Sequence, residues 1–329
     1  MEILEEAELC FPQLANASCK KLKRPHFQLV LSYIVLSSIA LLTTTLNLLL
    51  IVSIAHFRRL HTPTNFLLLS LAVSDFLVGV IVCVPILLVD GCWYLGDHTC
   101  VFFQYLGYVV TGASIGTMVI ISVDRYVAVC DPLRYASRMT QQRVQVSVCV
   151  CWTGSLLFQS LNLKENLSEP GRYHSCSGEC VVVTDYVLGL LDLLLSFVGP
   201  VLVIVLLYLR VFAVAVSQAR AARSRLAAVG GRGSLTVSVK KSELKAARTL
   251  GVVVLVFLVC VCPYFCVLLT GQNQLLNASS AVFVICLFYL NSCLNPLIYA
   301  FCYPWFKKSV QLIITLKILQ PGSANANIL

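Results

Sequence analysis

Seven long apolar stretches, separated by shorter polar ones, dominate the pattern of this chain. They cover approximately residues 28–55, 65–89, 101–129, 144–163, 184–215, 247–270 and 280–302. The hydrocarbon core of a bilayer is roughly 30 Å thick, and about 20 apolar residues cross it as a helix. Backbone amides in lipid must find hydrogen bonds within their own segment, which favours helices. The pattern therefore predicts an all-α membrane protein, a bundle of seven transmembrane helices.

Composition and charge add an orientation to this bundle. The chain is 58% hydrophobic and 12% charged, whereas soluble domains carry about 25% charged residues. Of its 24 Lys and Arg residues, 18 fall on one side of the predicted membrane, and such an excess marks the cytoplasmic side. We therefore expect a multi-pass protein of the plasma membrane, with an extracellular N-terminus over 1–27, the bundle over 28–303, and a short amphipathic helix and cytoplasmic tail over 304–329.

The predicted outer side also carries sequence signals of an extracellular compartment. Asn-X-Ser glycosylation sequons begin at Asn16, Asn166 and Asn277, and we expect a glycan at Asn16. The extracellular compartment is oxidising, which favours disulfides in the outer loops. The sequence by itself leaves the pairing of the cysteines open. Six of the 16 cysteines lie on this side: Cys10, Cys19, Cys92, Cys100, Cys176 and Cys180.

Several other classes of protein lack support in the sequence. The five histidines are scattered and complete no ligand set, so we expect no metal other than a sodium ion. We find no sequence context for catalysis, and therefore expect no enzyme, no resident cofactor and no nucleic-acid partner. No convincing internal repeat is visible, which leaves a membrane transporter as a distant alternative.

Two acidic residues, Asp75 and Asp192, lie deep within the predicted spans. An Asp at the centre of a membrane helix costs about 2.5–3.5 kcal/mol to insert and usually has a functional role. Asp75 has candidate polar partners on helices one, three and seven. These residues either only hold the helices together or also bind a small cation. The candidate partners are Asn47, Ser114, Asn291, Ser292 and Asn295.

Two motifs connect the sequence with a known family. Asp124-Arg125-Tyr126 closes the third span, and Asn295-Pro296-Leu297-Ile298-Tyr299 closes the seventh. Together they resemble the rhodopsin-like (class A) G protein-coupled receptors over about 28–310. Each span contains a residue similar to the family landmark: Asn47, Asp75, Arg125, Trp152, Pro200, Pro263 and Pro296. The run from Asn291 to Phe306 also resembles the fingerprint of trace amine-associated receptors.

This resemblance implies roles for individual residues. Arg125 would be held by Asp124 and by Glu243 and then released toward a G protein, with Asp75 and its partners forming an allosteric sodium site. Tyr208 and Tyr299 would move inward on activation, and Ile115, Pro200 and Phe257 would connect the ligand pocket to this end. Phe306 would open the amphipathic helix at the lipid surface. Cys100 would pair with Cys180, and Cys176 with Cys10 in preference to Cys19.

The departures from the family pattern point to the ligand. Amine receptors usually carry an Asp on helix three where this chain has Gly107, and a Trp on helix six where it has Val261. Asp192 lies eight residues before Pro200, roughly 12 Å toward the outside, which is the depth of the ligand pocket. We expect Asp192 to bind the ammonium of an amine odorant, rather than only to bond a neighbouring Tyr or Ser. The expected pocket also contains Tyr108, Thr111, Ser196, Tyr264, Phe265 and Tyr289.

The resemblance further implies signalling through a stimulatory or olfactory G protein that raises cyclic AMP. The alternative is a class A receptor for a non-amine small ligand. No Lys or Arg lies within the membrane near Asp192, which argues against an anionic ligand.

Overall fold

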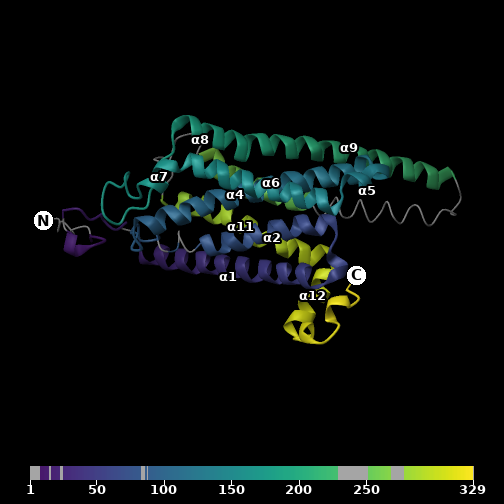
Figure 1. Ribbon diagram of the computed structural model, residues 1–329, viewed down its shortest axis with the longest axis horizontal. Helices are drawn as coiled ribbons and strands as arrows, with labels where there is room; N and C mark the ends of the chain where they lie inside the picture. The colour runs from purple at the N-terminus through teal and green to yellow at the C-terminus, as the bar shows by residue number, and fades with distance from the viewer. Residues whose placement is uncertain are drawn as a thin grey trace.

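The computed structural model describes residues 8–14, 16–22, 25–82, 86, 88–228, 251–267 and 278–328. Its long helices lie side by side along the longest axis of the molecule, with the described ends of the chain at opposite ends of the bundle (Figure 1). They are α1 (His26–His56), α2 (Pro63–Ile81), α4 (Asp97–Cys130), α6 (Gln141–Asn162), α8 (Tyr186–Leu193) with its continuation α9 (Gly199–Ala228), a helix over Gly251–Val267, and α11 (Ala278–Cys302).

Six of these described helices are long and apolar enough to cross a membrane, and Gly251–Val267 is a shorter apolar helix. The bundle thus has the seven-helix architecture that the apolar pattern predicts. Of the expected second span, about 65–89, α2 covers the residues up to Ile81, and in a turn at the outer end of this span Gly91 N donates to Leu88 O at 2.9 Å.

Apolar and polar residues are arranged in the opposite way to a soluble protein. Large apolar side chains such as Leu41, Leu157 and Phe212 are 67–70% exposed on the outside of the bundle, where lipid would cover them. Polar side chains such as Ser74, Asp75 and Asn295 are fully buried inside it. Buried polar groups need hydrogen-bond partners, so the interior of the bundle is where specific polar networks form.

The helix α4 lies at the centre of the bundle and contacts α2, α6 and α9. Its glycines allow a close approach of α6, because a Cβ at Gly112 would meet the Ser155 side chain at 2.5 Å. On the other side, α1 packs against α2 and α11. Trp152 on α6 donates to Ser70 Oγ on α2 at 3.1 Å, which ties these helices together behind α4.

The fifth membrane segment changes its helical geometry at the level of the expected ligand pocket. Between α8 and α9, residues Leu194–Val198 form a single π-helical turn, in which the backbone N–H of Gly199 bonds to Leu194 O. Pro200 follows and has no backbone N–H to donate, which favours an irregular turn just before it. Such turns are frequent at functional sites, and this one presents Asp192 and Ser196 on the same side.

The remaining elements are short. They are η1 (Pro12–Leu14), η2 (Arg58–Leu60), η3 (Pro132–Arg134), α5 (Tyr135–Arg138), α7 (Lys164–Ser168), η5 (Lys317–Leu319) and η6 (Ser323–Asn325). After α11, the expected amphipathic helix is α12 (Pro304–Ile314), in which Trp305 and Phe306 are buried while Lys307 and Lys308 are exposed. It begins at Pro304, the first residue of the segment 304–329 expected to contain it, and proline is favoured in the first turn of a helix.

Candidate functional site

A cavity of about 760 Å³ opens between the helices in the outer half of the bundle. All seven side chains expected in the ligand pocket line it: Tyr108, Thr111, Asp192, Ser196, Tyr264, Phe265 and Tyr289. Of the described lining residues, only Asp185 and Asp192 carry a charge, and none is Lys, Arg or His. The described wall is therefore acidic, which suits a cation and not an anion.

Asp192 is held by two neutral donors. Gln159 Nε2 donates to Asp192 Oδ1 at 2.6 Å, and Ser196 Oγ donates to the same oxygen at 2.9 Å. Asn162 in turn donates to Gln159 Oε1 at 3.0 Å. A Ser or Tyr partner for Asp192 was expected from the sequence, but the two amide side chains on α6 were not. Their spacing, three residues apart on one helix face, was the available signal.

Aromatic rings form another part of the cavity wall. Tyr264 lies 4.8 Å from Phe288 between ring centroids, and Phe265 stacks on Phe197 at 4.2 Å with an interplanar angle of 9°. Tyr289 is next to Phe288 in edge-on geometry. Such faces attract cations. Phe288 and Phe197 were not predicted from the sequence, because aromatic residues are common on all membrane helices.

The position of Gly107 is also part of this cavity. A Cβ there would meet only Ile81, at 3.9 Å. The described space around it is open and its nearby wall is apolar, with Val78 and Ile81 on α2. The apolar part of a ligand therefore has room beside helix three, while the charge lies at helix five.

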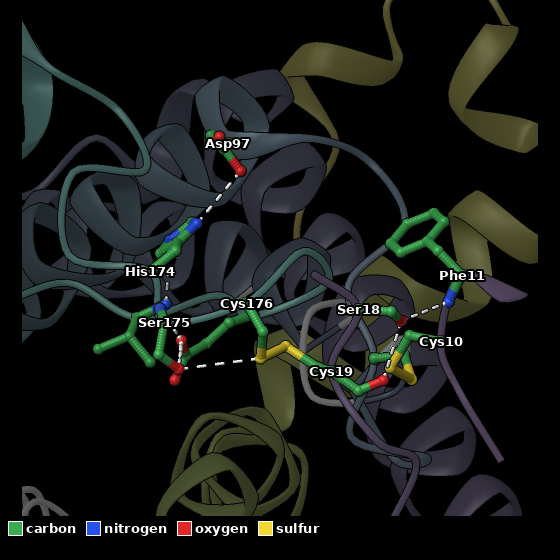
Figure 2. Close-up of a disulfide and its surroundings, with 11 residues drawn as sticks. Cys10, Phe11, Ser18, Cys19, Asp97, His174, Ser175 and Cys176 are labelled. Carbon is green, nitrogen blue, oxygen red and sulfur yellow. Dashed lines mark hydrogen bonds and ion pairs between the residues drawn. A yellow bond between two sulfur atoms is a disulfide. The ribbon is translucent and has the colours of Figure 1, made fainter. Parts of the chain in front are cut away.

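Three disulfides close the outer end of the bundle, using all six outer cysteines: Cys10–Cys92, Cys19–Cys176 and Cys100–Cys180. The Cys100–Cys180 pair is the one that the resemblance implied. The expected Cys10–Cys176 pair is wrong, because Cys176 bonds to Cys19 (Figure 2).

Backbone pairing explains this exchange of partners. Residues Leu9 and Lys20 form an antiparallel bridge, so the N-terminal segment is a hairpin, and Ser18 then pairs with Ser177 of the second outer loop. This pairing puts Cys19 beside Cys176. Gly178, at φ +102°, allows the loop to pass close to Cys10, and Gly178 O accepts from Trp93 N at 2.8 Å, which brings Cys92 to Cys10.

The second outer loop is held by polar contacts as well. His174 Nδ1 lies 3.2 Å from Asp97 Oδ1 at the start of α4 (Figure 2). Glu179 accepts from the backbone N–H of Ser175 at 2.6 Å, and this bond lowers the pKa of Glu179 below its usual range. The loop is thus fixed over the cavity from several directions.

The three sequons differ in accessibility. Asn16 is exposed, as a glycan acceptor must be, whereas Asn166 is 3% exposed. The Asn166 amide donates to Val183 O at 2.7 Å and accepts from Val183 N at 3.1 Å. Asn166 is too deeply buried to leave space for a glycan on that nitrogen, so it is a structural residue in the folded protein. Asn277 lies outside the described residues.

Below the cavity, a buried polar network surrounds Asp75. Asn295 Nδ2 donates to Asp75 Oδ2 at 2.8 Å, and Asn47 Nδ2 on α1 donates to Ser292 O at 3.0 Å. Four side-chain oxygens of this network, Asn47 Oδ1, Asp75 Oδ1, Asn291 Oδ1 and Asn295 Oδ1, are buried without a partner among the described residues. Ser114, Asn291 and Ser292 also line a small cavity of about 20 Å³. Unsatisfied acceptors around a carboxylate fit a small hard cation.

The cytoplasmic end of α4 holds the Asp124-Arg125-Tyr126 motif. Arg125 is buried and turned back onto Asp124, with its Nε donating to Asp124 Oδ2 at 2.9 Å. Thr64 accepts from Arg125 Nη2 at 2.9 Å, and Tyr135 OH donates to Asp124 Oδ1 at 2.9 Å. Glu243, the other expected partner of Arg125, lies outside the described residues.

The remaining residues expected to act in activation lie between these sites. Ile115 and Phe257 are buried in the main apolar core, Pro200 is partly buried, and Tyr126 packs against Val129 and Val211 at the inner end. Pro296 lies inside α11, before Tyr299. The hydroxyls of Tyr208 and Tyr299 are buried and have no partner among the described residues. Buried polar groups usually have a hydrogen-bond partner. A second packing of the helices, in which these two hydroxyls form hydrogen bonds, would explain why they lack one here.

Comparison with known proteins agrees with the seven-helix architecture. The sequence model of a protein family, the 7 transmembrane receptor (rhodopsin family), matches residues 46–299. Trace amine-associated receptor 13c of Danio rerio is 36% identical over 335 residues, covering 98% of this chain and 97% of that protein.

Two mammalian relatives are equally similar. Trace amine-associated receptor 1 of Mus musculus is 38% identical over 307 residues, covering 90% of this chain and 92% of its own. Trace amine-associated receptor 9 of Rattus norvegicus is 38% identical over 332 residues, covering 98% and 97%. The chain therefore belongs to the rhodopsin family of seven-transmembrane receptors and, within it, to the trace amine-associated receptors, multi-pass membrane proteins that act through a G protein and are not enzymes.

Proposed function

We propose that this receptor detects a cationic amine odorant through Asp192 and raises cyclic AMP through a stimulatory or olfactory G protein. The observation that carries this proposal is the charge of the outer cavity. Its described wall contains two carboxylates and no cationic side chain, so a cation is the ligand that it favours.

The energetics of binding follow from the surroundings of Asp192. An ammonium that enters a partly dry cavity loses its hydration and must recover that loss from a hydrogen-bonded anion. Asp192 supplies the anion, and the faces of Tyr264 and Phe288 add cation–π attraction of roughly 0.5–2 kcal/mol. The apolar part of the amine extends toward the space at Gly107. Asp185, at the rim, offers a second carboxylate to a diamine.

A sodium ion below the amine is part of the same proposal. Asp75, Ser114, Asn291, Ser292 and Asn295 would hold it. Asp75, Asn291 and Asn295 each have a buried oxygen without a partner among the described residues, and Ser114 and Ser292 line the small cavity. A bound cation would neutralise Asp75 and stabilise one packing of α2 against α11.

The proposed topology has the N-terminus and the disulfide-bonded loops outside the plasma membrane and Arg125 inside. The disulfides support it because they persist in oxidising compartments. The excess of Lys and Arg on the Arg125 side supports it independently. In this orientation the cavity at Asp192 opens toward external amines.

The test is a cyclic AMP dose–response curve for the most potent member of a panel of monoamines and diamines, on Asp192→Asn. This neutral change keeps the shape of the side chain. Loss of one partner of a buried charge pair costs about 2–5 kcal/mol, so the midpoint should rise by tens to thousands of fold. Ser160→Ala is a matched control, because Ser160 bonds Tyr105 on the lipid side of α6.

Two outcomes would contradict the proposal. An unchanged midpoint for Asp192→Asn at equal surface expression would mean that the ammonium binds elsewhere. A receptor that ignores every amine but responds to an uncharged ligand would favour the alternative of a non-amine receptor.

A further inference from the structure

The two oxygens of Asp192 have unequal surroundings. Both described donors, Gln159 Nε2 and Ser196 Oγ, bond to Oδ1. No side chain or backbone group in the described part of the chain donates to Oδ2. A carboxylate oxygen has about two lone pairs for hydrogen bonds, so Oδ1 is fully used and Oδ2 is free for a ligand.

We propose that Gln159 is a specificity-determining residue that makes this cavity select ammonium ligands over guanidinium ligands, by occupying one of the two carboxylate oxygens that a guanidinium needs. The inference rests on the proposed function, in which Asp192 receives the cation of the ligand. It concerns which chemical class of cation the site prefers.

The orientation of Gln159 is fixed by its neighbours. A carboxylate only accepts hydrogen bonds, so Gln159 must turn its amide nitrogen toward Asp192. Its Oε1 then faces away and accepts from Asn162 Nδ2 at 3.0 Å. Gln159 is 2% exposed and Asn162 5% exposed, so neither amide rotates freely. The donor to Oδ1 is therefore a rigid part of α6.

The second donor is held less firmly. Ser196 lies on the same membrane segment as Asp192, in the π-helical turn, and its hydroxyl can rotate about a single bond to find other acceptors. Gln159 has no such freedom. The occupancy of Oδ1 consequently depends chiefly on Gln159.

The two classes of cation use a carboxylate differently. A guanidinium is planar and pairs best through two parallel N–H bonds, one to each oxygen. With Oδ1 occupied, it keeps only one of these bonds or must displace Gln159 and leave a buried amide unsatisfied. An ammonium is a compact charge that needs one oxygen, and its other N–H groups face the aromatic wall. The wild-type cavity therefore binds the guanidinium less tightly than the ammonium.

The experiment compares isopentylamine with isopentylguanidine, which share an alkyl group and a single positive charge. The purified full-length receptor is titrated with each, and ligand binding is followed as the shift of its melting temperature, which requires no G protein. The variants are Gln159→Met, which keeps the chain length but lacks a donor, Gln159→Leu as a second version, and Asp192→Asn. Ser160→Ala is again the control.

The expected result is a change of preference. Wild type and Ser160→Ala should bind the amine more tightly than the guanidine, and Gln159→Met should lower that ratio by roughly tenfold, mainly through better guanidine binding. Gln159→Leu should change the ratio in the same direction. Asp192→Asn should weaken both ligands together.

The outcomes separate the two proposals. If Asp192→Asn weakens both ligands but the ratio is the same in wild type and both Gln159 variants, the proposed function stands and this inference is wrong. A ratio near one in the wild type would also overturn it. If Asp192→Asn leaves both affinities unchanged, the proposed function itself fails. Equal weakening of both ligands by Gln159→Met would assign Gln159 a purely structural role.

Discussion

Asp192 in the outer half of the bundle and Asp75 in the inner half are both acids within the membrane-spanning helices, and they have opposite surroundings. Asp192 lines an open cavity of about 760 Å³, and the described donors to it leave one oxygen free. Asp75 is fully buried among Asn47, Asn291 and Asn295, next to a space of about 20 Å³. The first space fits an organic ligand and the second fits about one water or ion.

This difference assigns different tasks to the two halves. The outer half is held from above by three disulfides and therefore keeps a preformed cavity for binding. In the inner half, polar atoms of Asp75, Tyr208 and Tyr299 are buried without a hydrogen-bond partner in the described part of the chain, and a different packing of the helices would provide partners. Changes in the outer half should therefore alter ligand potency, and changes in the inner half should alter the response at saturating ligand.

The largest effect should come from Arg125 at the inner end. Arg125→Ala removes the guanidinium that now bonds Asp124 and Thr64, and with it the group expected to contact the G protein. We expect loss of nearly all of the cyclic AMP response while ligand binding stays within a few fold of wild type. Surface labelling and a binding assay on the same cells check this. A full response from a well-expressed Arg125→Ala receptor would refute the assignment.

Asp75 should give a smaller and more specific effect. In Asp75→Asn the carboxylate that would hold sodium is neutral, while Asn295 keeps a polar partner. We expect the affinity for the amine to become insensitive to replacing sodium with a large organic cation in the buffer, whereas wild type changes severalfold. Choline chloride at constant ionic strength is a suitable replacement. Equal sodium dependence in both proteins would argue that Asp75 only holds helices together.

The sequence predicted which side chains lie at the two sites better than it predicted the contacts between them. Asp75, Asn295 and Arg125 have recognisable spacings on regular helices, so their positions followed from the chain. The amide pair Gln159 and Asn162 was missed because neither residue has a charge, and because the partner of each is chosen by helix packing.

The disulfides were predicted only in part, because the pairing of loop cysteines depends on the path of the backbone. Cys100 and Cys180 were paired through the resemblance to a family. The partner of Cys176 depends on a backbone hairpin between Leu9 and Lys20. The ten residues between them mix polar and apolar types without a clear period, so the sequence does not predict this hairpin. Loop cysteines pair where the backbone brings them, and the sequence alone does not contain that path.

The outer disulfides should have an intermediate effect, on stability more than on signalling. Cys19→Ser with Cys176→Ser removes a bond that closes a sequence separation of 157 residues. We expect a loss of about 2–5 kcal/mol in the free energy of unfolding, measured in detergent by thermal denaturation, together with weaker amine potency. Cys149→Ser is the matched control, because Cys149 is a free, exposed thiol on α6. A double Ser variant as stable as the control would show that this disulfide does not stabilise the receptor.

The smallest effects should separate the two described sequons. Asn16→Gln should increase electrophoretic mobility through loss of a glycan and leave the stability and the amine response unchanged, since Asn16 is exposed. Asn166→Ala should leave the mobility unchanged but lower stability by about 1–3 kcal/mol, because Val183 N and O lose their partners.

Ser168→Ala tests whether Asn166 carries a glycan or keeps an unmodified amide. It destroys that sequon but keeps the Asn166 side chain, and the Ser168 hydroxyl is exposed and bonds only the nearby Glu165 O. We therefore expect Ser168→Ala to match the wild type in both mobility and melting temperature. A mobility change in Ser168→Ala would mean that Asn166 carries a glycan, and its side chain could not then be buried as described.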